Sequence, residues 1–127
     1  MEKTVIRTEN APAPFQGAPY NQAIRVGDLV FVAGQLGLKP GDTAIEGDVA
    51  TQTEQALQNL GAILEAAGSS LDNLVKTSVF LQDLGDFAAM NEVYARHVGD
   101  RPPARSTFEV AKLPSGALVE IEAVAHT

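Results

Sequence analysis

The sequence feature that most constrains the fold is the C-terminal stretch 101–125. Two runs of β-branched and apolar residues flank the turn sequence Leu113-Pro114-Ser115-Gly116. Strand-forming runs on both sides of a Pro/Gly turn signal predict two strands joined by a short connection.

Each of these two strands carries a charge within a largely apolar run, Arg105 in the first and Glu120 in the second. Strand side chains alternate between faces, so Arg105 shares a face with Thr107, and Glu120 shares a face with Glu122. An arginine fork next to a carboxylate can hold a small carboxylate substrate and activate a water beside it. The alternative is an exposed cross-strand ion pair, which contributes only ~0.2–1 kcal/mol to stability. Spacing alone leaves both interpretations open.

Patterning upstream predicts six more elements. Strands are expected over residues 3–8, 22–26, 29–33 and 75–82, and helices over 48–67 and 86–98. Gly27-Asp28 predicts a tight hairpin turn between the second and third strands. Within strand 75–82, one face is expected to carry Val75, Thr77, Val79 and Leu81.

Both helices have recognisable ends. Asp48 is the expected N-cap of the first helix, with a capping box from Thr51 to Glu54 as the alternative, and Asp86 is the expected N-cap of the second. Glycines follow both C-terminal ends. The buried side of the second helix is expected to comprise Phe87, Met90, Val93, Tyr94 and His97.

The order of elements predicts the fold class. Right-handed strand–helix–strand crossovers place both helices on one face of a single sheet. The expected architecture is therefore α+β, a two-layer sandwich with a mixed six-stranded sheet. Strand 29–33 is apolar on both faces and is expected to be a central strand buried on both sides. Two helices cover only one face, so the other keeps an apolar surface and favours self-association.

Length and composition narrow the function. A chain of 127 residues is expected to form one domain, spanning residues 1–127. The net charge of −7 argues against nucleic acid or an anionic membrane as partner. Without cysteine there is no thiolate nucleophile, and His97 and His126 lack a third ligand at metal spacing, so no metal site is expected. No targeting or membrane-spanning pattern is present, which favours a cytoplasmic location.

Five segments carry a resemblance to a known family. The C-terminal segments 103–107, 109–114 and 119–123 (PARST, EVAKLP and VEIEA) resemble the signature of the Rid family, of the RidA type. Segment 18–24 (APYNQAI) is similar to the family's Gly-Pro-Tyr-x-Gln-Ala, and segment 86–91 (DFAAMN) matches Asp-Phe-x-x-x-Asn. The resemblance covers essentially the whole chain.

The resemblance implies a chorismate-mutase-like fold and an activity. Rid proteins of this type are reactive intermediate deaminases, which hydrolyse 2-imino acids such as 2-iminobutanoate and 2-iminopropanoate to 2-keto acids and ammonia. No metal or organic cofactor is implied. The expected assembly is a homotrimer with sites between subunits, in which Arg105 binds the substrate carboxylate and Glu120 activates water.

The resemblance also implies four substrate-binding residues: Tyr20, Gly34, Asn91 and Thr107. Tyr20 has the alternative of packing its own loop, and Asn91 that of anchoring its helix to the sheet. Three positions depart from the family pattern: Ala18 stands where glycine is usual, Ala33 where serine is common, and Thr107 where cysteine is frequent.

Two other functions compete with deamination. A ligand-binding or chaperone-like trimer without turnover is one, and Arg105, which non-deaminating branches of the family lack, argues against it. An endoribonuclease is the other. The charge of −7 and the lack of a basic, aromatic groove argue against RNA as substrate.

Overall fold

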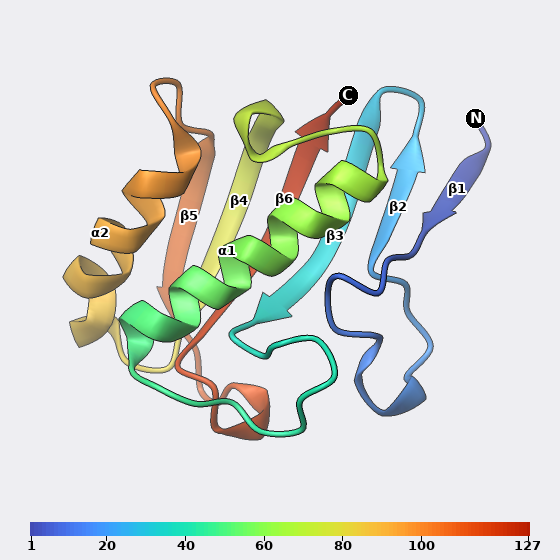
Figure 1. Cartoon of the computed structure of the whole chain (residues 1–127). Coiled ribbons are helices and arrows are strands. Elements are labelled where there is room, and N and C mark those ends of the chain that lie inside the picture. Colours follow the sequence, from blue (N-terminus) through green and yellow to red (C-terminus); the bar gives the residue numbers. More distant parts are fainter.

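The computed structural model describes residues 1–127 and has two layers (Figure 1). One layer is a six-stranded sheet, and helices α1 (Val49–Ala66) and α2 (Phe87–Val98) both lie on the same face of it. This confirms the predicted α+β sandwich. The strands are β1 (Lys3–Ile6), β2 (Ala23–Val26), β3 (Leu29–Leu36), β4 (Leu74–Leu81), β5 (Ala104–Glu109) and β6 (Val119–His126).

The strand order is β1-β2-β3-β6-β4-β5, and the sheet is mixed. Only β4 and β5 pair in parallel, because α2 forms the crossover between them. Strand β6 returns to the middle of the sheet and pairs antiparallel with both β3 and β4. The two predicted C-terminal strands therefore exist but are not neighbours, since β4 lies between them.

Local signals place most of the element ends. Gly27 has a φ of 58° in the turn between β2 and β3, which confirms the predicted hairpin. The side chain of Asp48 accepts a hydrogen bond from the Thr51 backbone N–H at 2.9 Å, so Asp48 is the N-cap of α1. Asp86 precedes α2 as predicted, but its side chain makes no capping hydrogen bond. A 3₁₀ turn (Leu84–Asp86) runs directly into α2, so Asp86 lacks the extended backbone that a capping side chain needs.

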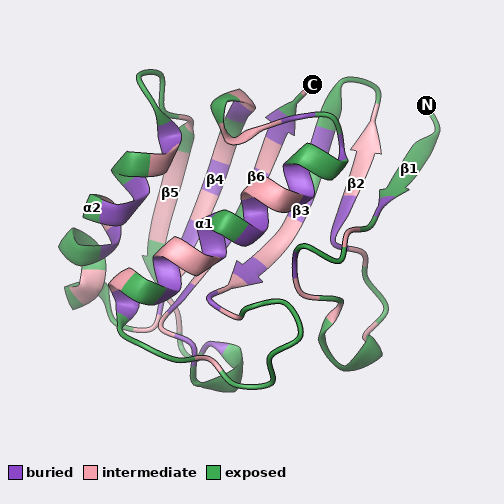
Figure 2. Ribbon diagram, in the orientation of Figure 1, coloured by how far each residue is buried: buried purple, intermediate pink, exposed green.

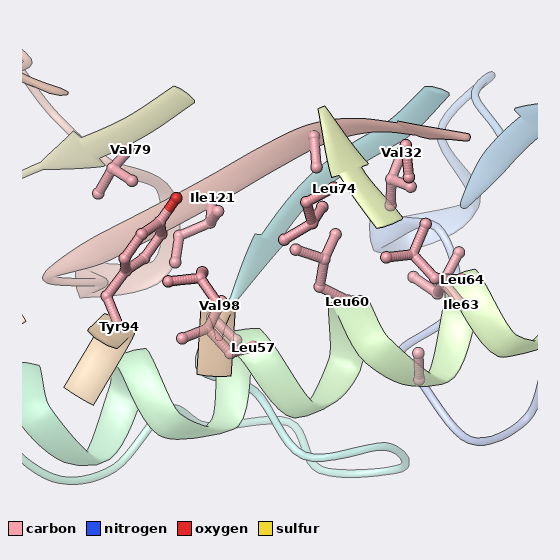
Figure 3. Close-up of a cluster of buried hydrophobic side chains, with 14 of the residues drawn as sticks. Val32, Leu57, Leu60, Ile63, Leu64, Leu74, Val79, Tyr94, Val98 and Ile121 are labelled. Carbon is pink, nitrogen blue, oxygen red and sulfur yellow. The ribbon is translucent and has the colours of Figure 1, made fainter. Parts of the chain in front are cut away.

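The hydrophobic core lies between the helices and the sheet (Figure 3). The buried side chains of α1 recur at helical spacing and face the sheet: Leu57, Leu60, Ile63 and Leu64, each fully buried. Against them pack side chains from strands β3, β4 and β6: Val32, Val79 and Ile121. Neither helix is long and apolar enough to cross a membrane.

No helix covers the other face of the sheet, and we call it the open face. Buried and less buried residues alternate along β3, β4 and β6 (Figure 2). In β3, Val30 and Val32 are buried, whereas Leu29 and Phe31 are 42% and 45% exposed. The prediction that this strand is buried on both sides is thus wrong for a single chain, because the helices cover only one face.

One strand departs locally from simple alternation. Of the four residues predicted to share a face of β4, Thr77, Val79 and Leu81 are buried, but Val75 is 46% exposed. A shift in the pairing with β6 occurs between Leu74 and Lys76, so Val75 is the extra residue of a β-bulge. The bulge turns the Val75 side chain out of the core.

Candidate active site

Arg105 lies on β5, the strand at the edge of the sheet, and faces the helix layer. It is paired with Thr77 of β4, which is fully buried beneath the helices. The guanidinium carbon lies 4.8 Å from the ring centre of Tyr94 and 5.5 Å from that of Phe87, both on α2. These are cation–π contacts.

No carboxylate of the chain pairs with Arg105. The two ion pairs of the structure join Glu92 to Arg96 and Glu54 to His97. The two rings of α2 therefore contact the guanidinium, and no acidic side chain is paired with it.

Phe87 and Tyr94 differ in burial and in hydrogen bonding beside Arg105. Phe87 is 40% exposed, so the prediction that it is buried is wrong. Its ring lies in the first turn of α2, where it contacts Arg105 and remains partly exposed to solvent. Tyr94 is buried as predicted, and its hydroxyl bonds the Thr77 hydroxyl at 2.6 Å. Burial raises the pKa of Tyr94, although the Thr77 bond and the Arg105 charge oppose this rise.

Two of the expected substrate-binding residues lie close to Arg105. Thr107 follows on the same face of β5, and its hydroxyl is buried without a hydrogen-bond partner. Asn91 is partly buried on α2, four residues after Phe87 and three before Tyr94, which places it on the same side of the helix. We call Arg105, Thr107 and Asn91 the arginine cluster.

Glu120 lies on the open face of the sheet. It is opposite Leu36 of β3 and Phe80 of β4. Partial burial raises the pKa of its carboxyl group, and the nearby charge of Glu122 adds to this rise. A Cβ atom on Gly34 would lie 2.5 Å from the Glu120 Oε2 atom, so the close approach of β3 to this carboxylate requires glycine.

Glu120 and Gly34 share a cavity of about 140 Å³ with Tyr20. Its other walls are mostly apolar and include Phe15, Leu36 and Leu38. We call Glu120, Gly34 and Tyr20 the carboxylate cluster. A larger groove of about 730 Å³ lies outside both clusters and is lined by residues such as Lys39, Glu54 and Arg96.

The loop over residues 9–19 forms one wall of this cavity and is held by two side chains. The Tyr20 hydroxyl accepts a hydrogen bond from the Phe15 backbone N–H at 2.6 Å, so Tyr20 both lines the cavity and packs its loop. Gln22 is 3% exposed, and its amide bonds backbone groups of Thr8, Ala11 and Pro12. Sequence reasoning did not identify Gln22 as the organiser of this loop.

The two clusters lie on opposite faces of the sheet. Arg105, Thr77 and Ala123 are aligned across β5, β4 and β6, and Ala123 is buried toward the helices. Glu120 has the opposite parity on β6 and points to the open face. The expectation of an arginine next to a carboxylate is therefore wrong within one chain.

Known proteins have the same fold and similar sequences. Residues 8–127 match the family model described as Endoribonuclease L-PSP. The crystal structure of RidA from an Antarctic Psychrobacter superposes with a TM-score of 0.93 at 42% identity, covering 98% of this chain and 99% of that one. The structure of E. coli TdcF with bound serine superposes with a TM-score of 0.90 at 39% sequence identity, and the match covers 98% of each chain.

Relatives by sequence agree with the structures. A RutC family protein of Pyrococcus horikoshii is 51% identical and covers 98% of both chains. The mouse protein named 2-iminobutanoate/2-iminopropanoate deaminase is 44% identical, covering 97% of this chain and 90% of that protein. The fold and the matching sequences define a protein of the L-PSP type. The chain belongs to the Rid family.

Proposed function

We propose that this protein hydrolyses reactive 2-imino acids, 2-iminobutanoate and 2-iminopropanoate among them, to 2-keto acids and ammonia. The observation that carries the proposal is the guanidinium of Arg105, which is held by two rings and has no carboxylate partner in the chain. Such a group is available for a bidentate pair with a substrate carboxylate. The name of the mouse relative and the serine bound to TdcF support a substrate of amino-acid type.

The proposed reaction needs one carboxylate and one water. Arg105 binds the substrate carboxylate, and backbone groups near Thr107 hold the other end of the substrate. With the imine protonated at nitrogen, Glu120 accepts one proton from water as the water oxygen bonds to the imine carbon and the C=N π pair moves to nitrogen. The resulting carboxyl group gives that proton to the amino nitrogen of the carbinolamine. The Glu120 carboxylate then accepts the hydroxyl proton as the C=O bond forms and the carbon–nitrogen bond breaks, and this proton leaves with ammonia as ammonium. A raised pKa suits Glu120 to this exchange, because acceptance and return then occur closer to neutral pH. The imine is already electrophilic, so the scheme uses no metal or organic cofactor.

A complete site of this kind takes its two clusters from different copies of the chain. Opposite faces of one sheet cannot both face one substrate, whereas a neighbouring copy can present its open face to the arginine cluster. The exposed apolar side chains of the open face, among them Leu29, Phe31 and Phe108, support burial against another copy. We propose a homotrimer with three such intersubunit sites.

The first experiment measures ammonia release. A pyridoxal-phosphate threonine dehydratase generates 2-iminobutanoate in the cuvette, and the protein is expected to accelerate ammonia release above the spontaneous rate. A parallel reaction with RNA tests the endoribonuclease alternative, which the description of the family model favours and the net charge of −7 opposes. Binding of 2-ketobutanoate without ammonia release would instead support the ligand-binding alternative and refute deamination.

The second experiment tests whether the site is shared between copies. Arg105→Ala and Glu120→Gln are each expected to be inactive alone. If the two variants are unfolded, mixed in equal amounts and refolded together, about a quarter of the sites regain both native residues, because each site draws one residue from each of two copies. Recovery of about a quarter of wild-type activity is expected. A mixture that stays inactive while refolded wild type recovers would refute the shared site.

A further inference from the structure

Tyr94 is a buried polar side chain beside the arginine cluster. It is 5% exposed, and its ring reaches from α2 toward the sheet beside Val79 and Ile121 (Figure 3). Its hydroxyl bonds the hydroxyl of Thr77, which is itself fully buried, at 2.6 Å. A buried hydroxyl needs such a partner, so the bond fixes the far end of the ring.

The hydrogen bond between Tyr94 and Thr77 lies next to Arg105 in the sheet. Thr77 and Arg105 are direct partners in the pairing of β4 with β5. The Thr77 hydroxyl thus holds the Tyr94 ring at the level of Arg105, and the ring face is directed at the guanidinium, whose carbon lies 4.8 Å from the ring centre. The ring attracts the cation through its face, and no carboxylate of the chain occupies the in-plane N–H donors.

We propose that Tyr94, fixed by Thr77, is a positioning residue that sets the orientation of the Arg105 guanidinium. As a role in catalysis, this rests on the proposed binding of the substrate carboxylate by Arg105. A carboxylate partner would orient the arginine equally well but would compete with the substrate for the same donors. An aromatic face orients the arginine without that competition.

Phe87 provides an internal comparison. It also faces the guanidinium, but at 5.5 Å, and it is 40% exposed, with no hydroxyl to fix it. A solvent-exposed ring attracts a cation less than a buried one does. Removal of the Phe87 ring is expected to affect Arg105 less than removal of the Tyr94 ring.

The first test reads Arg105 directly by NMR and needs no activity. A guanidinium over a ring face experiences the ring current, so the Arg105 Nε–H proton of the wild type is expected upfield of the other arginines. Arg105→Lys assigns the signal by removing it. Tyr94→Phe retains the ring and is expected to keep most of the upfield shift, whereas Tyr94→Leu abolishes it. An Arg105 signal at the position of the exposed arginines in the wild type would overturn the proposal, whether or not Tyr94→Leu folds.

The second test separates positioning from stability. Tyr94→Leu is expected to raise KM for the 2-imino acid about 5- to 10-fold with a smaller change in kcat, as expected for a cation–π contact. Tyr94→Phe should restore KM to within about twofold of wild type, although it leaves the Thr77 hydroxyl unpaired and lowers thermal stability. Phe87→Leu should raise KM less than Tyr94→Leu does.

A double variant completes the test. In an Arg105→Lys background, Tyr94→Leu should have little further effect on KM, because Tyr94 acts through the guanidinium. Additive effects would show that Tyr94 acts through general stability, and would overturn the proposal. An upfield Arg105 signal without ammonia release would refute the deaminase function and leave the positioning contact standing. Ammonia release with an unshifted Arg105 signal would support the deaminase function and refute the positioning contact.

Discussion

Gly34→Ala is expected to impair catalysis without unfolding the chain. A Cβ atom at this position would lie 2.5 Å from Glu120 Oε2 and 2.9 Å from Glu120 Cδ. Gly34 is not among the glycines with positive φ, so alanine fits its backbone without strain. The clash therefore falls on the end of a flexible side chain, and the Glu120 carboxylate is the group that moves.

The required movement sets the size of the effect. The carboxylate oxygen must retreat by about 0.9 Å to reach the ordinary contact distance of 3.4 Å. A misplacement of about 1 Å at a reacting group can reduce the rate about 100-fold. We expect kcat/KM to fall about 10- to 100-fold, or about 1.4–2.7 kcal/mol of transition-state stabilisation. The free energy of unfolding should change by less than about 1 kcal/mol.

The assay is steady-state ammonia release, paired with urea unfolding to measure stability. Gly61→Ala is the matched control, because it makes the same chemical change in α1, where the new Cβ would lie 3.3 Å from Leu71 Cδ1 and far from both clusters in sequence. The control should keep full activity. If Gly34→Ala retained wild-type kcat/KM while Glu120→Gln lost it, the position of the carboxylate would not matter and the reasoning would fail.

Further predictions concern the two clusters and the assembly. Arg105→Lys should lose most imine hydrolysis, because lysine keeps the charge but not the planar fork, and near-wild-type rates would refute the bidentate clamp. Glu120→Gln should bind 2-keto acids without turnover, and loss of turnover in Glu122→Gln instead would reverse the assignment. The pKa of Glu120 is raised in the folded state, so the wild type loses stability as pH rises from about 4.5 through that pKa. Glu120→Gln should therefore have a higher melting temperature than the wild type at neutral pH, and this difference in melting temperature should shrink on acidification. Light scattering should give about three times the 13.4 kDa chain mass, and an active monomer would contradict the shared site.

The secondary structure could be predicted because its signals are local. The Asp48 cap, the apolar stripe of α1 and the Gly27-Asp28 turn act within a few residues of their own position. The layering of the fold also followed from the order of elements. One error, the bulge that exposes Val75, lies where pairing with a strand remote in sequence decides the outcome. The other is local: a 3₁₀ turn runs into α2 and replaces side-chain capping by Asp86.

Local signals of this kind could not predict the strand order. A short connection between two strands suggests neighbours, yet β6 crosses to the far side of β4 before it pairs. The driving force is the burial of apolar side chains. Strand β6 lies between β3 and β4, and in this position its residues Val119 and Ile121 are fully buried. That gain depends on strands remote in sequence.

The same limit explains why the relative placement of the candidate site residues could not be predicted. Alternation assigns faces within one strand, but the relative face of Arg105 and Glu120 depends on the registers of β5 with β4 and of β4 with β6. A shift of one residue in either register would have placed both on one face, and one chain could then have held the whole site. The observed register separates them, so the catalytic pair proposed for this chain can form only between copies. Under the proposed function, activity requires assembly of copies as well as folding of one chain, because no single segment encodes the pairing register.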